Sequence, residues 1–253
     1  MLKKRIIPIL LLENNKLVKT INFKNPKYIG DPINAVKIFN EKTVDELVVL
    51  DIDASRTNQI NFQLIKNLAG ECRMPFTYGG GINSLEHANY LFSIGVEKLL
   101  INSILFKNPN LVNEISNKFG AQSVVISINL KKSFFGNYKI YDWLNAKTID
   151  EDINTFVNKF IKKGIGEIMI TFVDNEGSLS GFDLDSIQKL KLSISIPLVI
   201  NGGINSLNNM KLCLGSPYID AIGVGSYFVY YGPHKAVLIN YPSADEKRKI
   251  LDR

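Results

Sequence analysis

The sequence predicts an α/β fold, a (β/α)8 TIM barrel, from three observations. Short runs rich in β-branched and apolar residues alternate with longer amphipathic stretches along the whole chain, a pattern typical of βαβ units and a parallel sheet. Eight such units in 253 residues match the size of one barrel. The two halves of the chain resemble each other, which favours a single barrel built from two half-barrel repeats over two separate domains.

The eight expected strands follow one another along the chain. The first is almost continuously apolar, as expected of a strand that is buried on both faces. The eight runs are RIIPILL (5–11), ELVVLDI (46–52), PFTYG (75–79), KLLIN (98–102), SVVISIN (123–129), EIMITFV (167–173), PLVIN (197–201) and AIGVG (221–225). Helical patterns lie between them, including PINAVKIFNEKT (32–43), SLEHANYLF (84–92) and NTFVNKFIKKG (154–164).

Two pairs of motifs carry the internal repeat. ELVVLDID begins at Glu46 and EIMITFVD at Glu167, an offset of 121 residues. GGINSL begins at Gly80 and again at Gly202, an offset of 122 residues. Both offsets are close to half the chain length, so residues 1–253 are interpreted as one domain.

Composition excludes several functional classes. The net charge is +6 and the pI about 9.1, which fits either a lysine-rich solvated surface or an anionic substrate or acidic partner. The lysines are dispersed and accompany no nucleic-acid motif, so no nucleic-acid partner is expected. No apolar run approaches the roughly 18 residues of a membrane span, and the N-terminus does not resemble a signal peptide. We therefore expect no membrane partner and a cytoplasmic location.

The residues that bind metals in other proteins are sparse here. Cys72 and Cys213 lack metal-ligand spacing and suit a reducing compartment. His87 and His234 lie far apart in the sequence, on different expected segments. The sequence therefore predicts no metal site and no cofactor.

Glycine-rich stretches follow four of the expected strands. They are GGGINS (79–84), INS (101–103), NGGINS (201–206) and GVGS (223–226). Adjacent glycines let backbone N–H groups approach an anion closely, although they also make tight turns. Because each half carries a matching set, two phosphate sites are expected across the barrel mouth. The expected phosphate-binding residues are Gly81, Asn102, Ser103, Gly177, Ser178, Gly202, Gly203, Gly225 and Ser226.

Several motifs, in order, carry a resemblance to a known family. They are GDP (30–32), DELVVLDIDAS (45–55), PFTYGGGI (75–82), GEI (166–168), DNEGSLSGFD (174–183) and NGGI (201–204). Over nearly its whole length the chain resembles the cyclase subunit of imidazole glycerol phosphate synthase. The resemblance implies a half-barrel repeat with two phosphate sites. It also implies a glutaminase partner at the barrel bottom, whose ammonia passes through the barrel to a phosphoribosyl substrate at the top.

The chain departs from that family at the two positions that carry its chemistry. The family uses two aspartates, at the ends of strands one and five, as general acid and base. Leu11 and Asn129 stand there instead, and losing one positioned acid or base typically costs about 10²–10⁴-fold in rate. Possible substitute acids are Asp51, Asp53, Asp174 and Glu176. Asp51 and Asp174 also fit a role in ordering loops.

The expected bottom of the barrel matches the family. The family closes its ammonia entrance with four charges, and this sequence offers Arg5, Glu46, Lys98 and Glu167 at the starts of strands one, two, four and six. Buried charges are costly unless they are paired. Two charges of each sign would form a neutral, salt-bridged gate for ammonia.

The C-terminal segment, residues 226–253, is interpreted as a divergent extension. SYFVYYGPHKAVLINYP (226–242) resembles a branch of the family associated with acetamidino modification of surface sugars, where a glutaminase and an ATP-dependent amidotransferase similar to the N-type pyrophosphatases are partners. Part of this segment is expected to contact that amidotransferase at the top of the barrel. Its aromatic residues fit either an interface or local packing, namely Tyr227, Phe228, Tyr230, Tyr231 and Tyr241.

Three functions remain open from the sequence. The favoured one is a non-catalytic, ammonia-conducting barrel in a glutamine-dependent amidotransferase complex that modifies a nonulosonic acid or another surface-glycan sugar. The second is an authentic imidazole glycerol phosphate synthase cyclase, a lyase, with displaced acids. The third is a phosphosugar-binding regulatory module.

Overall fold

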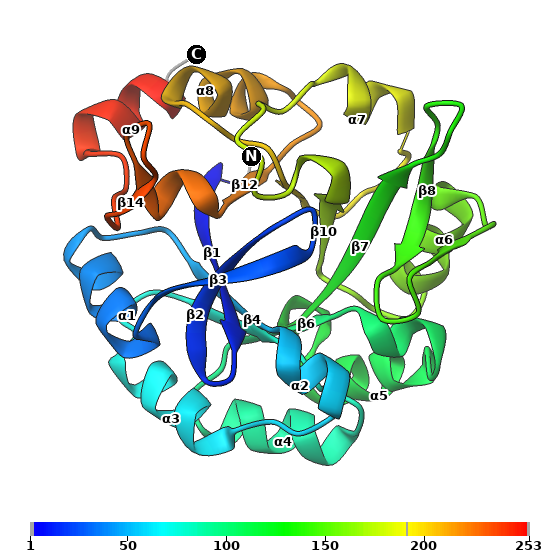
Figure 1. The fold of residues 1–253 in the computed structure, drawn as a ribbon. Helices are drawn as coiled ribbons and strands as arrows, with labels where there is room; N and C mark the ends of the chain where they lie inside the picture. Colours follow the sequence, from blue (N-terminus) through cyan, green and yellow to red (C-terminus); the bar gives the residue numbers. More distant parts are fainter. Residues whose placement is uncertain (1–2, 191, 252–253) are drawn as a thin grey trace.

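The computed structural model describes residues 3–190 and 192–251, and it contains a closed parallel barrel (Figure 1). Neighbouring strands pair in parallel around the whole circle, and the last pairs with the first through Arg5 and Ala221. The barrel strands are β1 (Arg5–Glu13), β4 (Leu47–Asp51), β5 (Phe76–Gly79), β6 (Lys98–Ile101), β7 (Val124–Lys132), β10 (Glu167–Phe172), β11 (Leu198–Asn201) and β12 (Ala221–Val224). The predicted TIM barrel and its eight strands are confirmed.

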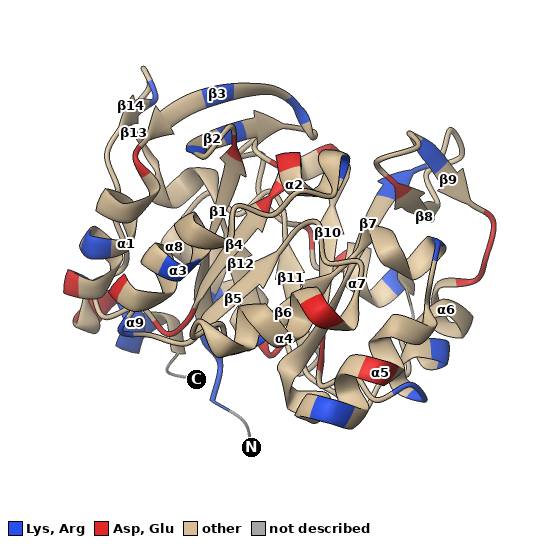
Figure 2. Ribbon diagram, turned by 90° about the horizontal axis from the view of Figure 1, so that it is seen from below, with Lys and Arg blue, Asp and Glu red and all other residues tan. Residues whose placement is uncertain are grey.

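Helices surround the barrel on the outside, except for the short α2 (Ile52–Thr57), which lies at the end of the barrel opposite the chain termini (Figures 1 and 2). The helices are α1 (Pro32–Glu41), α2 (Ile52–Thr57), α3 (Phe62–Glu71), α4 (Leu85–Ser93), α5 (Asn110–Phe119), α6 (Ile153–Ile161), α7 (Asp185–Leu190), α8 (Leu207–Gly215) and α9 (Ala244–Leu251). Polar side chains begin several of them, as Asp31 does for α1 and Ser84 for α4, each accepting a hydrogen bond from a backbone N–H of the first turn. None of these described helices is long and apolar enough to cross a membrane.

Three hairpins were not predicted. They are β2 (Lys16–Ile21) with β3 (Lys24–Gly30), β8 (Tyr138–Asp142) with β9 (Lys147–Ile149), and β13 (Tyr230–Tyr231) with β14 (Ala236–Val237). β1 and β7, the first strands of the two halves, each continue beyond the barrel and pair antiparallel with a hairpin. The half-barrel repeat therefore includes the hairpin that follows the first strand of each half. Figure 2 shows all three hairpins at the end of the barrel opposite the chain termini.

Side chains of the barrel strands alternate between two apolar layers. On β1, Ile6, Leu10 and Leu12 belong to the large cluster between strands and helices. Ile7, Ile9 and Leu11 belong to a smaller cluster inside the barrel. The remaining buried members of this inner cluster are Val18, Val48, Leu100, Val125, Met169, Val199 and Ala221.

The C-terminal segment completes the barrel as well as adding a hairpin. α9 follows the eighth strand and packs on α8. Phe228 is fully buried, and the buried Tyr241 hydroxyl donates a hydrogen bond to the Ile6 carbonyl over 2.9 Å. These two aromatic residues are therefore part of the core and do not form an interface. Tyr231, by contrast, is exposed.

Candidate functional site

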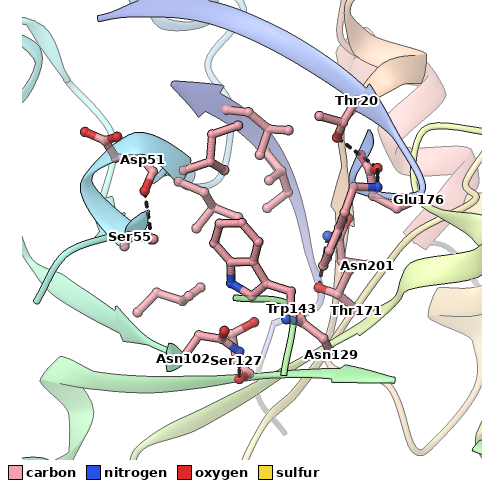
Figure 3. Close-up of a pocket in the computed structure, with 18 of the residues that line it drawn as sticks. Thr20, Asp51, Ser55, Asn102, Ser127, Asn129, Trp143, Thr171, Glu176 and Asn201 are labelled. Atoms are coloured by element: carbon pink, nitrogen blue, oxygen red, sulfur yellow. Dashed lines mark hydrogen bonds between the residues drawn. The ribbon is translucent and has the colours of Figure 1, made fainter. Parts of the chain in front are cut away.

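The carboxyl ends of the barrel strands open into one cavity, here called the mouth (Figure 3). Residues from both half-barrels line it, together with residues of the hairpins β2–β3 and β8–β9. In barrels of this class the functional site lies at this end, because several loops converge there. The chemistry that the chain can perform is therefore set by the side chains that face the mouth.

The inward-facing residues of the eight barrel strands that line the mouth are uncharged. Those of the first half are mostly apolar, with Ile9, Leu11, Leu50 and Leu100 lining one side. Those of the second half are neutral and polar, and they comprise Ser127, Asn129, Thr171 and Asn201. Leu11 and Asn129, the two positions at which the family carries aspartates, both line this cavity and are both buried. Neither side chain can exchange a proton near neutral pH.

The four candidate substitute acids are all engaged in local structure. Asp51 begins α2, where its Oδ1 accepts from the Ala54 N–H over 2.8 Å. Burial raises the pKa of Asp51 to about 6. In Figure 3 its carboxylate points away from the other labelled residues. Asp53 accepts from the Asn14 N–H.

The other two candidates hold loops at the mouth. Asp174 accepts from the Lys132 N–H over 2.7 Å. Glu176 is buried and accepts from the Thr20 hydroxyl over 2.9 Å and from the Phe23 N–H over 3.1 Å. Glu176 therefore fixes the β2–β3 hairpin over the mouth. The contact of Asp174 favours the loop-ordering role expected for that residue.

Eight of the nine predicted phosphate-binding residues line the mouth, namely Gly81, Asn102, Ser103, Gly177, Gly202, Gly203, Gly225 and Ser226. Ser178 is not among the lining residues, and its hydroxyl donates to the Asn175 carbonyl. Two lining side chains have a buried polar atom without a protein partner, Asn102 Oδ1 and Ser226 Oγ. A buried polar atom without a partner is costly, so these atoms are ready to bond a ligand or water.

Close packing explains part of the glycine pattern. Gly81 has φ +67°, and a Cβ there would lie 2.8 Å from the Ala54 carbonyl oxygen. Gly203 has φ +94°, and a Cβ there would lie 2.6 Å from the Gly181 carbonyl oxygen. Asn102 and Gly225 precede one-turn 3-10 helices, Ser103–Phe106 and Ser226–Phe228, instead of full helices. These two glycines thus serve tight turns and close packing of the backbone beside the cavity.

Lys19 is a lining residue that the sequence reasoning missed. It lies on β2, is 4% exposed, and points toward the eighth strand, where its Nζ occupies the space next to Gly225. Burial lowers the pKa of Lys19, and the nearby Glu176 partly offsets that effect. The sequence around Lys19 gives no sign that this side chain is buried. Its burial depends on the β2–β3 hairpin folding over the mouth, which the local pattern does not predict.

The four predicted gate residues meet at the opposite end of the barrel, and we call them the charged ring. Arg5 forms ion pairs with Glu46, at 2.5 Å, and with Glu167. Lys98 forms ion pairs with the same two glutamates, at 3.0 and 3.1 Å. Burial lowers the pKa of Arg5, but the two carboxylates outweigh it and the net change is upward. Each charge thus meets two of the opposite sign in a closed circuit.

An apolar layer separates the charged ring from the mouth. It contains Ile7, Val48, Val125, Met169, Val199 and Ala221, all buried and none of them lining the cavity. A TIM barrel interior is normally a packed core and not a pore. A small neutral molecule that crosses from the ring to the mouth must therefore pass between these side chains, of which Met169 is the most flexible.

Within the described ranges, no group of three or more metal-ligating side chains comes together. Cys72 and Cys213 are free thiols, and burial raises the pKa of each to about 12. His87 packs against Phe62 on the outside of the barrel, and its ring lies 3.2 Å from the Gly81 carbonyl oxygen. The helix predicted around His87 is confirmed.

Comparison with known proteins agrees with this geometry. The sequence profile of a family described as "Histidine biosynthesis protein" matches residues 5–235. A Vibrio vulnificus protein provisionally named imidazole glycerol phosphate synthase subunit hisF3 is 42% identical, over 100% of this chain and 98% of the relative. A Pseudomonas aeruginosa protein provisionally named subunit hisF2 is 43% identical, over 97% of this chain and 98% of the relative.

A relative with an unqualified name is more distant. Imidazole glycerol phosphate synthase subunit HisF of Streptococcus mutans is 36% identical, over 83% of this chain and 84% of the relative. The family profile ends at residue 235 and so leaves the end of the C-terminal segment outside the match. The matched range covers all eight barrel strands, and the chain therefore belongs to the histidine biosynthesis protein family.

Proposed function

We propose that this chain is the ammonia-delivering barrel of a glutamine-dependent amidotransferase complex and does not itself close the imidazole ring. The observation that carries this proposal is the contrast between the two ends of the barrel. The charged ring keeps all four members in contact. The mouth presents Leu11 and Asn129 at the two positions where the family places its acid and base.

The interior suits ammonia and not ammonium. Taking a charged ion out of water into an apolar interior costs several kcal/mol, on the order of a buried unpaired charge, whereas neutral ammonia avoids that cost. The layer between ring and mouth is apolar, and the inward-facing strand residues above it are uncharged. A glutaminase docked over the charged ring would release ammonia directly at that end of the barrel.

For the acceptor we propose an ATP-dependent amidotransferase similar to the N-type pyrophosphatases, which converts an acetamido group of a surface-glycan sugar to an acetamidino group. The support is the resemblance of residues 226–242 to that branch of the family. Two of the relatives carry the names hisF2 and hisF3. Numbered names of this kind suit a barrel that an organism has in addition to its histidine-pathway cyclase. The nonulosonic acid or amino sugar is the proposed substrate class.

The test is a reconstituted mixture of barrel, glutaminase and amidotransferase. Glutamine-driven product should require the barrel, whereas added ammonium salt should bypass it. Lys98→Ala should separate glutamine hydrolysis from product formation, because the ring loses one of its two cations. Lys66→Ala is the matched control, since Lys66 is exposed on α3, on the outside of the barrel. Full glutamine-driven product without the barrel would overturn the proposal.

The second candidate is a cyclase of imidazole glycerol phosphate synthase with displaced acids, which the relatives' names favour. We expect no detectable turnover of the phosphoribosyl intermediate with ammonium salts, because neither Leu11 nor Asn129 can transfer a proton. The double change Leu11→Asp with Asn129→Asp is expected to give trace turnover. Wild-type turnover within about tenfold of an ordinary cyclase would establish this second candidate instead.

A further inference from the structure

We infer that three hairpins around the mouth form a docking surface for a protein partner with an acidic face. This surface, here called the hairpin surface, comprises residues 16–30, 131–149 and 230–238. The inference rests on the proposed function, in that the partner is taken to be the enzyme that accepts ammonia at the mouth. Figure 1 places β8 and β14 on opposite sides of the barrel, with β2 and β3 between them.

Exposed apolar side chains gather on this surface. Ten large hydrophobic residues are exposed in the part of the chain that the structure describes, and seven of them lie on the three hairpins. The seven are Ile21, Tyr28, Phe134, Phe135, Tyr231, Val237 and Leu238. Scattered exposed apolar residues need no explanation, but their concentration around one opening indicates a binding surface.

Phe134 and Phe135 are the most exposed members of the set. They lie in the turn between β7 and β8, with 98% and 87% of their surface accessible. Their rings contact each other edge to face, with centroids 5.6 Å apart. Nothing else in the fold covers them, so packing within the chain does not explain two adjacent phenylalanines there. Aromatic residues of this kind are enriched at the centres of protein interfaces.

The net positive charge of the protein lies on the same three segments. They carry nine lysines and one acidic residue, Asp142, which gives a net charge of +8. The rest of the chain has 21 basic and 23 acidic residues, a net charge of −2. Asp142 and Lys19 are both buried, which leaves eight lysines and no acidic residue outside the buried core of these segments. Of these eight lysines only Lys139 forms an ion pair among the described residues, with Asp150. The surface is therefore complementary to an acidic one.

A protein fits these features better than a small anion does. Lysines around a mouth would steer a small anionic substrate, but exposed phenylalanines at a turn tip contribute nothing to that. An apolar set surrounded by charges is the usual anatomy of a protein interface. A partner that covers the mouth would also keep ammonia from escaping into water between the two proteins.

Binding between the barrel and the purified ATP-dependent amidotransferase tests the inference, measured by sedimentation or calorimetry. Phe134→Ser with Phe135→Ser should weaken binding by at least about tenfold, as for truncated aromatic anchors. Lys24→Glu with Lys27→Glu should weaken it by a similar factor, and raising salt from about 50 to about 300 mM should also weaken it. Leu212→Ser, an exposed apolar change on α8, is the matched control and should leave binding unchanged.

The outcomes separate this inference from the proposed function. If wild-type barrel supports glutamine-driven product while both hairpin variants bind as tightly as wild type, the docking surface is wrong and ammonia delivery stands. If wild-type barrel never supports product, the proposed function fails. If the wild type binds vesicles of anionic phospholipid but not the amidotransferase, and the variants lose that binding, the partner is a membrane surface and this inference is overturned. Circular dichroism of each variant checks that it is folded.

Discussion

The two ends of the barrel hold polar groups in different ways. At the bottom, every charge of the ring contacts two charges of opposite sign, and Thr77 donates a further hydrogen bond to Glu46 over 2.9 Å. At the mouth, the inward-facing residues of the barrel strands are uncharged, and Asn102 Oδ1 and Ser226 Oγ have no hydrogen-bond partner among the described residues. The charged groups at the bottom are paired with one another, whereas the mouth has polar atoms that can still bond another molecule.

The difference lies in how strongly the residues at each end of the barrel depend on one another. A ring of paired charges is interdependent, because losing one member leaves another charge buried without its partner. Leu11, in contrast, packs with the other apolar side chains of the inner cluster and needs no partner. The charged ring thus holds together as a unit, whereas Leu11 occupies an ordinary packing position and Asn129 an amide position at the mouth.

The largest expected effect comes from breaking the charged ring. Glu46→Ala removes a carboxylate that is 3% exposed and leaves Arg5 and Lys98 with one partner each. The free energy of unfolding should fall by about 3–5 kcal/mol, the usual cost of breaking a buried ion pair. Chemical denaturation measures this value. Arg248→Ala breaks an exposed ion pair with Asp245 and should change stability much less, by about 0–1 kcal/mol. Equal small losses in both variants would mean that the ring is not an interdependent unit.

A carboxylate introduced at the apolar side of the mouth should lower the free energy of unfolding by less than breaking the charged ring does, but by a measurable amount. Leu11→Asp places an acid at a position that is 8% exposed among apolar side chains. Near neutral pH the free energy of unfolding should fall by about 2–4 kcal/mol. Because burial raises the pKa of the new carboxyl, the loss should shrink as pH falls toward the pKa of unfolded aspartate. Asn129→Asp, on the polar side of the mouth, should lower the free energy of unfolding by less than Leu11→Asp at every pH. Denaturation curves that give the same loss for both variants would contradict the contrast between the two sides.

The smallest expected effect is a pH dependence at the edge of the mouth. Burial raises the pKa of Asp51 from 3.8 to about 6. Between these values the folded protein holds a proton that the unfolded chain releases, so stability should fall as pH rises through this window, by at most about 3 kcal/mol. Asp51→Asn keeps a side chain that begins α2 well and should flatten this part of the profile. An unchanged slope in denaturation curves from pH 4 to pH 6 would show that Asp51 is not its source.

Much of the barrel was predictable because its signals are local or periodic. Each barrel strand is a short apolar run, and the half-length offset of the motifs shows the repeat. The ring was predicted from the resemblance to the family, whose four charges match the charged residues at the start of four such runs. Eight of the nine residues predicted to bind phosphate also line the mouth, and Ser178 is the exception.

The hairpins and their consequences were not predictable in the same way. β3 has five exposed residues in succession and includes Pro26, as is common in edge strands, so its pattern resembles a loop. The burial of Lys19 follows from the position of that hairpin, which Glu176 fixes from 156 residues away in the sequence. Phe228 and Tyr241 were considered interface candidates because an aromatic-rich tail gives no periodic signal of burial.

The central claim is that ammonia moves from the charged ring to the mouth without mixing with water. Amide-¹⁵N glutamine supplied to the complete complex in the presence of excess unlabelled ammonium salt tests it most directly, with the isotope content of the amidinated sugar as the readout. Wild-type barrel is expected to give product that carries mostly the glutamine label. Lys98→Ala, but not Lys66→Ala, should lower that fraction toward the isotope ratio of the solution. Product from the wild-type complex that already carries the isotope ratio of the solution would contradict ammonia transfer through the barrel.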